Sequence, residues 1–284
     1  MPLSLTFLGT SAANAYPEAW CSCDNCGCAQ DLGGPSLRKR SAALLRDDLL
    51  LDLGPDIMAA AQMHGCPLTN VRHCLQTHAH ADHLDPSHLL SRSPGYGVVG
   101  APRLDLYASP ATLQSLVRTY ERDLAGDRLS DPETLERLNL NLCPIEPWQT
   151  VELGPYQVLA VPANHEPAEA CLLFAVRTTE DAVFYGTDTA RLPEDVWQGL
   201  RLSGWCFDTV VLDHTYGPDE PGSDHLCARE VAEHVARMRE EGLLSDRGRA
   251  FATHISHEGN PPHPELSVWA SEHGYEIAHD GLTV

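Results

Sequence analysis

Short apolar runs recur along the whole chain, and glycine, proline or charged residues separate them. Runs of this kind with such boundaries are typical of buried strands. Two of them flank Arg46-Asp47-Asp48, whose composition is that of a turn, so this region is predicted to form a hairpin. The predicted strands are residues 3–8, 41–45, 49–53, 71–76, 103–107, 157–161, 171–176, 182–185 and 209–212.

Apolar residues at spacings of three and four indicate helices between some of these strands. Leu113, Leu116 and Tyr120 form one such apolar face, and Pro110 suits the first turn of the helix that carries it. The predicted helices are residues 56–64, 110–124 and 226–241.

The organisation of the chain is that of one α/β unit. Residues 127–142 are charged with regularly spaced leucines, which fits either another helix or a mobile insertion that borders a pocket. No linker, repeat or change of composition divides the sequence, so residues 1–284 are expected to form a single domain.

The charge of the chain restricts its partners. Its 284 residues carry 19 Lys and Arg against 40 Asp and Glu, a formal net charge of −21, and Lys39 is the only lysine. Such a surface repels polyphosphate backbones, which disfavours nucleic acid as a partner. A small phosphorylated substrate remains compatible, because bound metal cations reverse the potential locally.

Nothing in the sequence predicts a membrane span, because no apolar run approaches the roughly 20 residues required. Ala13-Asn14-Ala15 imitates a signal-peptidase site, but no Lys or Arg precedes it. Close cysteine spacing favours metal binding over a disulfide framework, so we expect a reducing, cytoplasmic location. A homodimer is left open.

A dense histidine segment follows the predicted strand at residues 71–76. His78, His80, Asp82 and His83 stand at i, i+2, i+4 and i+5. Imidazole and carboxylate groups suit Zn²⁺, Mn²⁺ or Fe²⁺, and two metals about 3.5–4 Å apart need six or seven such ligands. The order of these residues predicts a metal site at the end of a strand.

This segment resembles the HxHxDH signature of the metallo-β-lactamase superfamily. The resemblance extends to His165, Asp188 and His254, which follow in the superfamily's order, and to Asp52 as its early supporting aspartate. It implies a four-layer αβ/βα sandwich with two facing mixed sheets. It also implies two divalent metals, Zn or Mn, with a bridging hydroxide: the first metal on His78, His80 and His165, the second on Asp82, His83 and His254, and Asp188 between them.

Cys21, Cys23 and Cys26 supply three soft ligands on what is predicted to be a short loop, and a closed zinc site needs a fourth. The arrangement resembles phosphodiesterases of the carbon–phosphorus lyase pathway, in which such a loop joins the second histidine of a Thr-His-Ile-Ser-His segment. Residues 253–257 match that segment, so the resemblance implies a structural zinc on the three cysteines and His257. Cys28 and His225 are competing ligands, and a Cys21–Cys28 or Cys23–Cys26 disulfide is the alternative.

The resemblance implies a metal-dependent hydrolase, a phosphodiesterase that cleaves a small cyclic phosphate or nucleotide through the metal-bridging hydroxide. Its proton donor is open, because the family's histidine falls on Tyr216 here, with His214 two residues earlier. His225 is a third candidate, and Asp82 is a further expected catalytic residue besides its role as a ligand.

Three other enzyme classes remain as alternatives. A tyrosine in place of the acid would suit a better leaving group, as in a lactone, a thioester or another small ester. The segment around His225 resembles tRNA 3′-processing endonucleases, although the net charge of −21 opposes capture of tRNA. Iron-dependent oxidation of a persulfide uses a similar ligand set. A metal-stabilised binding protein is the non-enzyme alternative.

Overall fold

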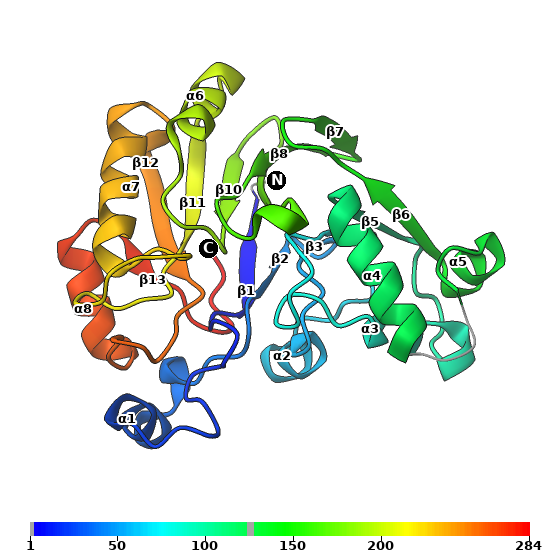
Figure 1. Ribbon diagram of the computed structural model, residues 1–284, viewed down its shortest axis with the longest axis horizontal. Helices are drawn as coiled ribbons and strands as arrows, with labels where there is room; N and C mark the ends of the chain where they lie inside the picture. Colours follow the sequence, from blue (N-terminus) through cyan, green and yellow to red (C-terminus); the bar gives the residue numbers. More distant parts are fainter. Residues whose placement is uncertain (1–2, 124–127) are drawn as a thin grey trace.

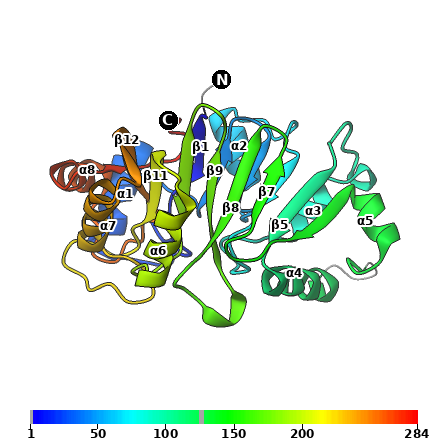
Figure 2. The ribbon, with the colours of Figure 1, turned by 90° about the horizontal axis from the view of Figure 1, so that it is seen from above.

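The computed structural model describes residues 3–123 and 128–284. A six-stranded and a seven-stranded sheet face each other across a shared apolar core, which includes Phe7 and Leu75 from one sheet and Phe174 and Phe251 from the other. Helices lie outside both sheets, with α7 and α8 on one side and α3 and α4 on the other (Figures 1 and 2). This arrangement confirms the predicted α/β fold with two facing mixed sheets.

The first sheet runs in the order β1 to β6. Neighbouring strands are antiparallel from β1 to β3 and parallel from β3 to β6. The predicted hairpin is present, with Leu45 opposite Leu49. The strands are β1 (Leu5–Gly9), β2 (Ala42–Leu45), β3 (Leu49–Leu51), β4 (His73–Leu75), β5 (Leu104–Ala108) and β6 (Leu140–Pro144).

The second sheet has the order β13-β12-β11-β10-β9-β8-β7. Its strands are antiparallel from β7 to β10 and parallel from β10 to β13. The strands are β7 (Thr150–Leu153), β8 (Tyr156–Pro162), β9 (Leu172–Arg177), β10 (Ala182–Gly186), β11 (Phe207–Asp213), β12 (Leu244–Thr253) and β13 (Glu276–Ile277).

The helices bury one apolar face each, as helical periodicity predicts. In α7, Val231, Val235 and Met238 are buried at positions i, i+4 and i+7. No helix among the described residues is long and apolar enough to cross a membrane. The helices are α1 (Asp24–Leu32), α2 (Ile57–His64), α3 (Ser87–Ser91), α4 (Pro110–Asp123), α5 (Pro132–Leu138), α6 (Glu194–Ser203), α7 (Ala228–Glu240) and α8 (His263–Glu272).

Three predicted elements differ from the observed ones. Residues 128–142 form neither one helix nor one insertion but the short α5 followed by β6, and residues 124–127 lie outside the described part of the chain. The strand expected at residues 49–53 ends at Leu51, because Asp52 adopts a φ of 66° and turns the chain. Cys26 lies in α1 rather than in a loop, since the Cys23 thiol accepts a hydrogen bond from the Cys26 N–H at the start of that helix.

Candidate metal centres

The histidine and aspartate side chains lie beyond the carboxyl ends of strands from both sheets. The segment with His78 and His83 follows β4, Asp188 follows β10 and His254 follows β12. His165 follows β8, which runs parallel to β10 because both are antiparallel to β9. These strand ends meet at one edge of the sandwich, so residues far apart in sequence come together there.

The first ligand group is His78, His80 and His165, whose ring nitrogens lie within 4.8 Å of one another. His165 Nε2 is 3.4 Å from His80 Nδ1. His78 Nε2 is buried without a hydrogen-bond partner among the described residues, although its Nδ1 lies 2.9 Å from the Thr77 hydroxyl. Burial and neighbouring histidines hold the pKa of His78 well below its ordinary value, which keeps a neutral lone pair for a cation.

The second ligand group is Asp82, His83 and His254. Asp188 lies against it, with Oδ2 2.6 Å from His83 Nε2 and Oδ1 3.2 Å from His254 Nε2. Burial alone would lower the pKa of His83, but the carboxylates of Asp188 and Asp82 outweigh burial and hold it well above its usual value. These buried carboxylates call for a cation, and a divalent metal supplies more positive charge than a protonated imidazole.

Two buried aspartates orient the histidines in matching ways. Asp52 accepts a hydrogen bond of 2.8 Å from His83 Nδ1 and one of 2.9 Å from the Thr77 hydroxyl, which in turn faces His78 Nδ1. Hydrogen bonds of this kind fix the tautomer and direction of a metal-binding imidazole.

In the other sheet Asp213 orients two further histidines. It accepts a hydrogen bond of 2.8 Å from His225 Nδ1 and one of 3.0 Å from the Thr215 hydroxyl, which lies 2.8 Å from His254 Nδ1. Burial alone would lower the pKa of His225, but Asp213 outweighs burial and raises it to about 9. His225 is therefore an imidazole held by a carboxylate beside the metal ligands, and that carboxylate favours its protonated form.

A cavity of about 210 Å³ opens onto these groups. His225 and Tyr216 line it together with several of the ligands, and the Tyr216 hydroxyl donates a hydrogen bond of 2.9 Å to Asp224. The structure does not bring His214 to this cavity. That side chain is fully buried, its Nδ1 lies 3.4 Å from the Tyr275 hydroxyl, and burial lowers its pKa to about 3. A neutral, enclosed imidazole has no access to a leaving group, which corrects its place among the acid candidates.

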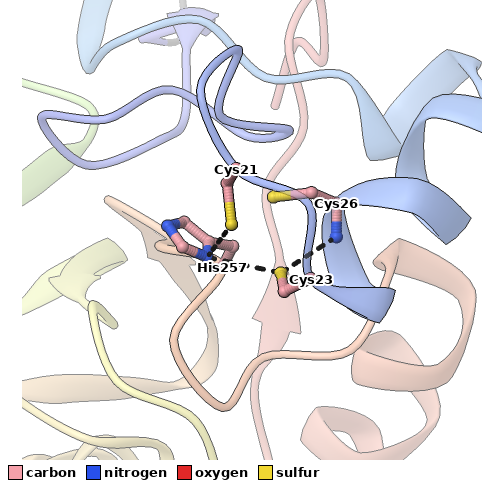
Figure 3. A group of neighbouring side chains, drawn as sticks. All are labelled: Cys21, Cys23, Cys26 and His257. Atoms are coloured by element: carbon pink, nitrogen blue, oxygen red, sulfur yellow. Dashed lines mark hydrogen bonds between the residues drawn. The ribbon is translucent and has the colours of Figure 1, made fainter.

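A separate cysteine group lies away from these histidines. It consists of Cys21, Cys23, Cys26 and His257, whose ligand atoms also lie within 4.8 Å of one another. Figure 3 shows their sulfur atoms and the imidazole turned toward a common centre. His257 Nδ1 lies 3.7 Å from the Cys21 Sγ and 3.6 Å from the Cys23 Sγ. Three thiols and one imidazole at these separations are the donor set of a tetrahedral structural zinc site.

The structure decides between the alternatives for this cluster. None of the ten cysteines, all of which belong to the described residues, forms a disulfide, so neither Cys21–Cys28 nor Cys23–Cys26 is one. Cys28 is exposed and lies outside the ligand group, and His225 belongs to the cavity instead. A hydrogen bond from the Cys26 N–H lowers the pKa of Cys23 to about 7, which favours a thiolate ligand.

One short segment connects both groups. His254 and His257 are three residues apart, and Ile255 between them is fully buried. The Ile255 N–H donates to the Thr10 carbonyl at 2.9 Å, and the Ala12 N–H donates to the Ile255 carbonyl at 3.2 Å. The chain from Ala12 onward lines the cavity and then leads to Cys21, so each ligand group fixes the backbone beside the other.

Four residues of the site have no functional role in the sequence interpretation: Asp213, Thr215, Asp224 and Glu258. Asp213 follows a predicted strand, and an aspartate at such a position in a parallel sheet is the signal that could have identified it. The other three belong to polar loops, whose sequence carries no comparable signal.

Residues 48–255 match the model of a family described as the beta-lactamase superfamily domain. A curated relative, coenzyme PQQ synthesis protein B of Cupriavidus necator, is 24% identical and the match covers 99% of each chain. The fold is similar to that of a solved new diphosphatase from the PhnP family, at TM-score 0.75 and 22% identity over 100% of this chain and 97% of that one. Zn²⁺-bound PqqB from Methylobacterium extorquens has TM-score 0.70 and 19% identity over 99% of each chain. The chain belongs to the metallo-β-lactamase superfamily of metal-dependent hydrolases.

Proposed function

We propose that this protein is a phosphodiesterase with two divalent metals, Zn or Mn, that hydrolyses a small phosphodiester such as a cyclic phosphate or a nucleotide. The observation that carries the proposal is one open cavity that is lined by ligands of both groups and by His225, whose Nδ1 is hydrogen-bonded to Asp213. The first metal would lie on His78, His80 and His165, and the second on Asp82, His83 and His254. Asp188, which is near ligands of both groups, would bridge them.

When bound, the metals would supply an activated hydroxide and neutralise the nonbridging phosphate oxygens. The remaining requirement is a proton for the departing alkoxide, and the chain itself provides one. His225 lies beside the ligands, with its ring 4.8 Å from the His165 ring and 5.1 Å from the His254 ring. Asp213 holds its Nδ1, which leaves Nε2 to donate to the leaving oxygen.

Tyr216 is the weaker donor of the two. Its proton is directed at Asp224, and burial raises the pKa of its hydroxyl above the ordinary value. Its ring lies 6.1 Å from that of His225. We assign Tyr216 to positioning and His225 to proton transfer.

The decisive experiment compares leaving groups. The metal-loaded protein is assayed with two substrates. Bis(p-nitrophenyl) phosphate has a leaving group that needs no proton, whereas the alkoxide that leaves a cyclic nucleotide must be protonated. His225→Gln lowers kcat for the cyclic nucleotide by about 10²-fold or more and changes aryl diester hydrolysis far less. Tyr216→Phe is the comparison variant: because it removes a positioning contact and not the proton donor, it should lower both activities by a similar, smaller factor.

Two results would overturn the proposal. Equal losses on both substrates would remove His225 from proton transfer. Hydrolysis of lactones or thioesters, with no turnover of any phosphodiester by the metal-loaded protein, would assign the site to another class of ester.

We also propose a structural zinc on Cys21, Cys23, Cys26 and His257. Its support is the convergence of three thiols and one imidazole, whose ligand atoms lie within 4.8 Å of one another. Elemental analysis of protein purified without added metal should find zinc that survives mild chelation, while chelation removes phosphodiesterase activity.

A further inference from the structure

Among the described residues that line the cavity beside the metal ligands, His225 is the one basic side chain apart from the proposed ligands, and Asp213 holds it in an ion pair. Apart from the proposed ligands, the carboxylates that line the cavity are those of Asp224 and Glu258. No lysine or arginine is among the described residues of its lining. A binding site for several phosphate groups would need such cations.

Asp224 is held in place from two sides. Its Oδ1 accepts hydrogen bonds from the hydroxyls of Tyr216, at 2.9 Å, and Ser223, at 2.5 Å. Its backbone carbonyl accepts a bond of 3.3 Å from His165 Nδ1, so this residue touches a proposed metal ligand. Both side-chain bonds use Oδ1, which leaves Oδ2 as an acceptor for a donor on a bound molecule.

Glu258 joins the same wall through the backbone. The Gly217 N–H donates to the Glu258 carbonyl at 3.0 Å. A Cβ at Gly217 would lie 1.8 Å from the Gly259 carbonyl oxygen, so only glycine permits this contact. Tyr216 therefore lies between the two carboxylates along the wall: its hydroxyl binds Asp224, and the next residue, Gly217, binds the backbone of Glu258.

The charge balance of the cavity sets a limit on the substrate. Two divalent cations, offset by Asp82, Asp188 and the activated hydroxide, would leave one positive charge, which the single charge of a phosphodiester neutralises. The charge of His225 is balanced by Asp213. Any further phosphate on the substrate would face Asp224 and Glu258. At separations of several ångströms in a partly hydrated site, repulsion of this kind costs on the order of tenfold in affinity for each extra charge.

We propose that Asp224 and Glu258 are specificity-determining residues. They select phosphodiesters whose diester is the only anionic group and whose attached group presents hydroxyls, which carboxylates accept as hydrogen-bond donors. This inference rests on the proposed phosphodiesterase function and names its substrate class.

The test uses two substrates that differ by one distal phosphate: adenosine 2′,3′-cyclic phosphate and its 5′-phosphorylated form. With metal-loaded full-length protein we expect kcat/KM to be at least about tenfold higher for the first. Asp224→Asn and Glu258→Gln each reduce this preference severalfold, mainly through KM for the 5′-phosphorylated substrate, and the double variant abolishes it. Asp219→Asn is the control, because this carboxylate on the same segment is 93% exposed and pairs with Arg229 outside the cavity.

A binding measurement separates this inference from the proposed function. Calorimetry compares adenosine 3′-phosphate with adenosine 3′,5′-bisphosphate on the metal-loaded protein. Weaker binding of the bisphosphate, equalised in the double variant, supports the inference even if neither cyclic nucleotide is hydrolysed, a result that would overturn only the phosphodiesterase. Equal handling of both pairs by the unmodified protein, or a preference that persists in the double variant, overturns the inference.

Discussion

The two candidate metal centres differ in how the chain builds them. The cysteine group takes three ligands from residues 21–26, at the N-terminal end of α1, and one from residue 257. Cys26 is buried and the other three ligands are half-buried. The histidine–carboxylate group draws ligands from the ends of four strands in two sheets, and most of them are buried. One centre is nearly local, and the other exists only in the assembled sandwich.

This difference indicates separate roles. Three thiolates and one imidazole around one point would complete a tetrahedral zinc site, so the cavity beside Cys21, Cys23 and Cys26 would offer a substrate no open coordination position, which is characteristic of a structural site. The histidine–carboxylate group opens onto a cavity and has His225 beside it, so a reacting molecule has access. The first centre should therefore control stability and the second should control turnover.

The largest effect expected is on turnover. Asp188 contacts ligands of both histidine groups and has a φ of 56°, which asparagine tolerates. Asp188→Asn should lower phosphodiester hydrolysis about 10³-fold or more while the cysteine centre keeps its zinc. Rate measurements and elemental analysis of the same sample test this. Loss of all bound metal would show that the two centres are not independent.

The next effect is on stability. Cys23→Ser removes one zinc ligand, and a metal present at 1,000 times its Kd stabilises the folded state by roughly 4 kcal/mol. Urea unfolding should show most of that loss. Cys28→Ser is the matched control, because Cys28 is exposed and outside the ligand group, and it should change unfolding by about 0.5 kcal/mol or less. An unchanged Cys23→Ser protein would rule out a zinc site there.

A smaller effect concerns the residues behind the ligands. Asp52→Asn takes the carboxylate acceptor from His83 Nδ1 and from Thr77. It should weaken metal binding in the catalytic group about 10- to 100-fold, measured by competition with a chelator. The cysteine centre should retain its affinity. Equal weakening of both centres would indicate general unfolding rather than a change in the orientation of His83.

The smallest effect depends on pH and lies outside both centres. Arg40 Nε and Nη2 donate to the two oxygens of Asp56 at 2.8 Å and 2.7 Å. Burial alone would raise the pKa of Asp56, but these bonds outweigh burial and hold it below its ordinary value. A lowered folded-state pKa stabilises the protein above the unfolded-state pKa of about 3.9, and that stabilisation disappears as the pH falls through the folded-state pKa.

Asp56→Asn should therefore lower the free energy of unfolding by about 1 kcal/mol at pH 7. The difference between the two proteins should persist at pH 5 and shrink below pH 4, as measured by urea unfolding. A difference that is the same at every pH would mean that packing, rather than the ion pair, is responsible.

Much of the fold is predictable because buried strands have short apolar sequences. The predicted strand at residues 182–185 is β10, and the predicted helix at residues 226–241 is α7 with a clear apolar face. The patterns do not delimit β12, since the part of it that β13 does not cover carries the charged residues Asp246, Arg247 and Arg249. They also miss α8, whose first turn contains His263 and Pro264 and resembles a loop.

The sequence by itself determined the superfamily and identified the side chains that the structure brings together as two candidate ligand groups, because ligand type and spacing can be read from the chain. Only the tertiary structure decided which imidazole meets Asp213. His214 is its neighbour in sequence but is enclosed beside Tyr275, whereas His225 returns from a distant loop to within 2.8 Å of the carboxylate. Position along a chain does not encode such a contact, because packing of the β11 and α7 segments sets the distance.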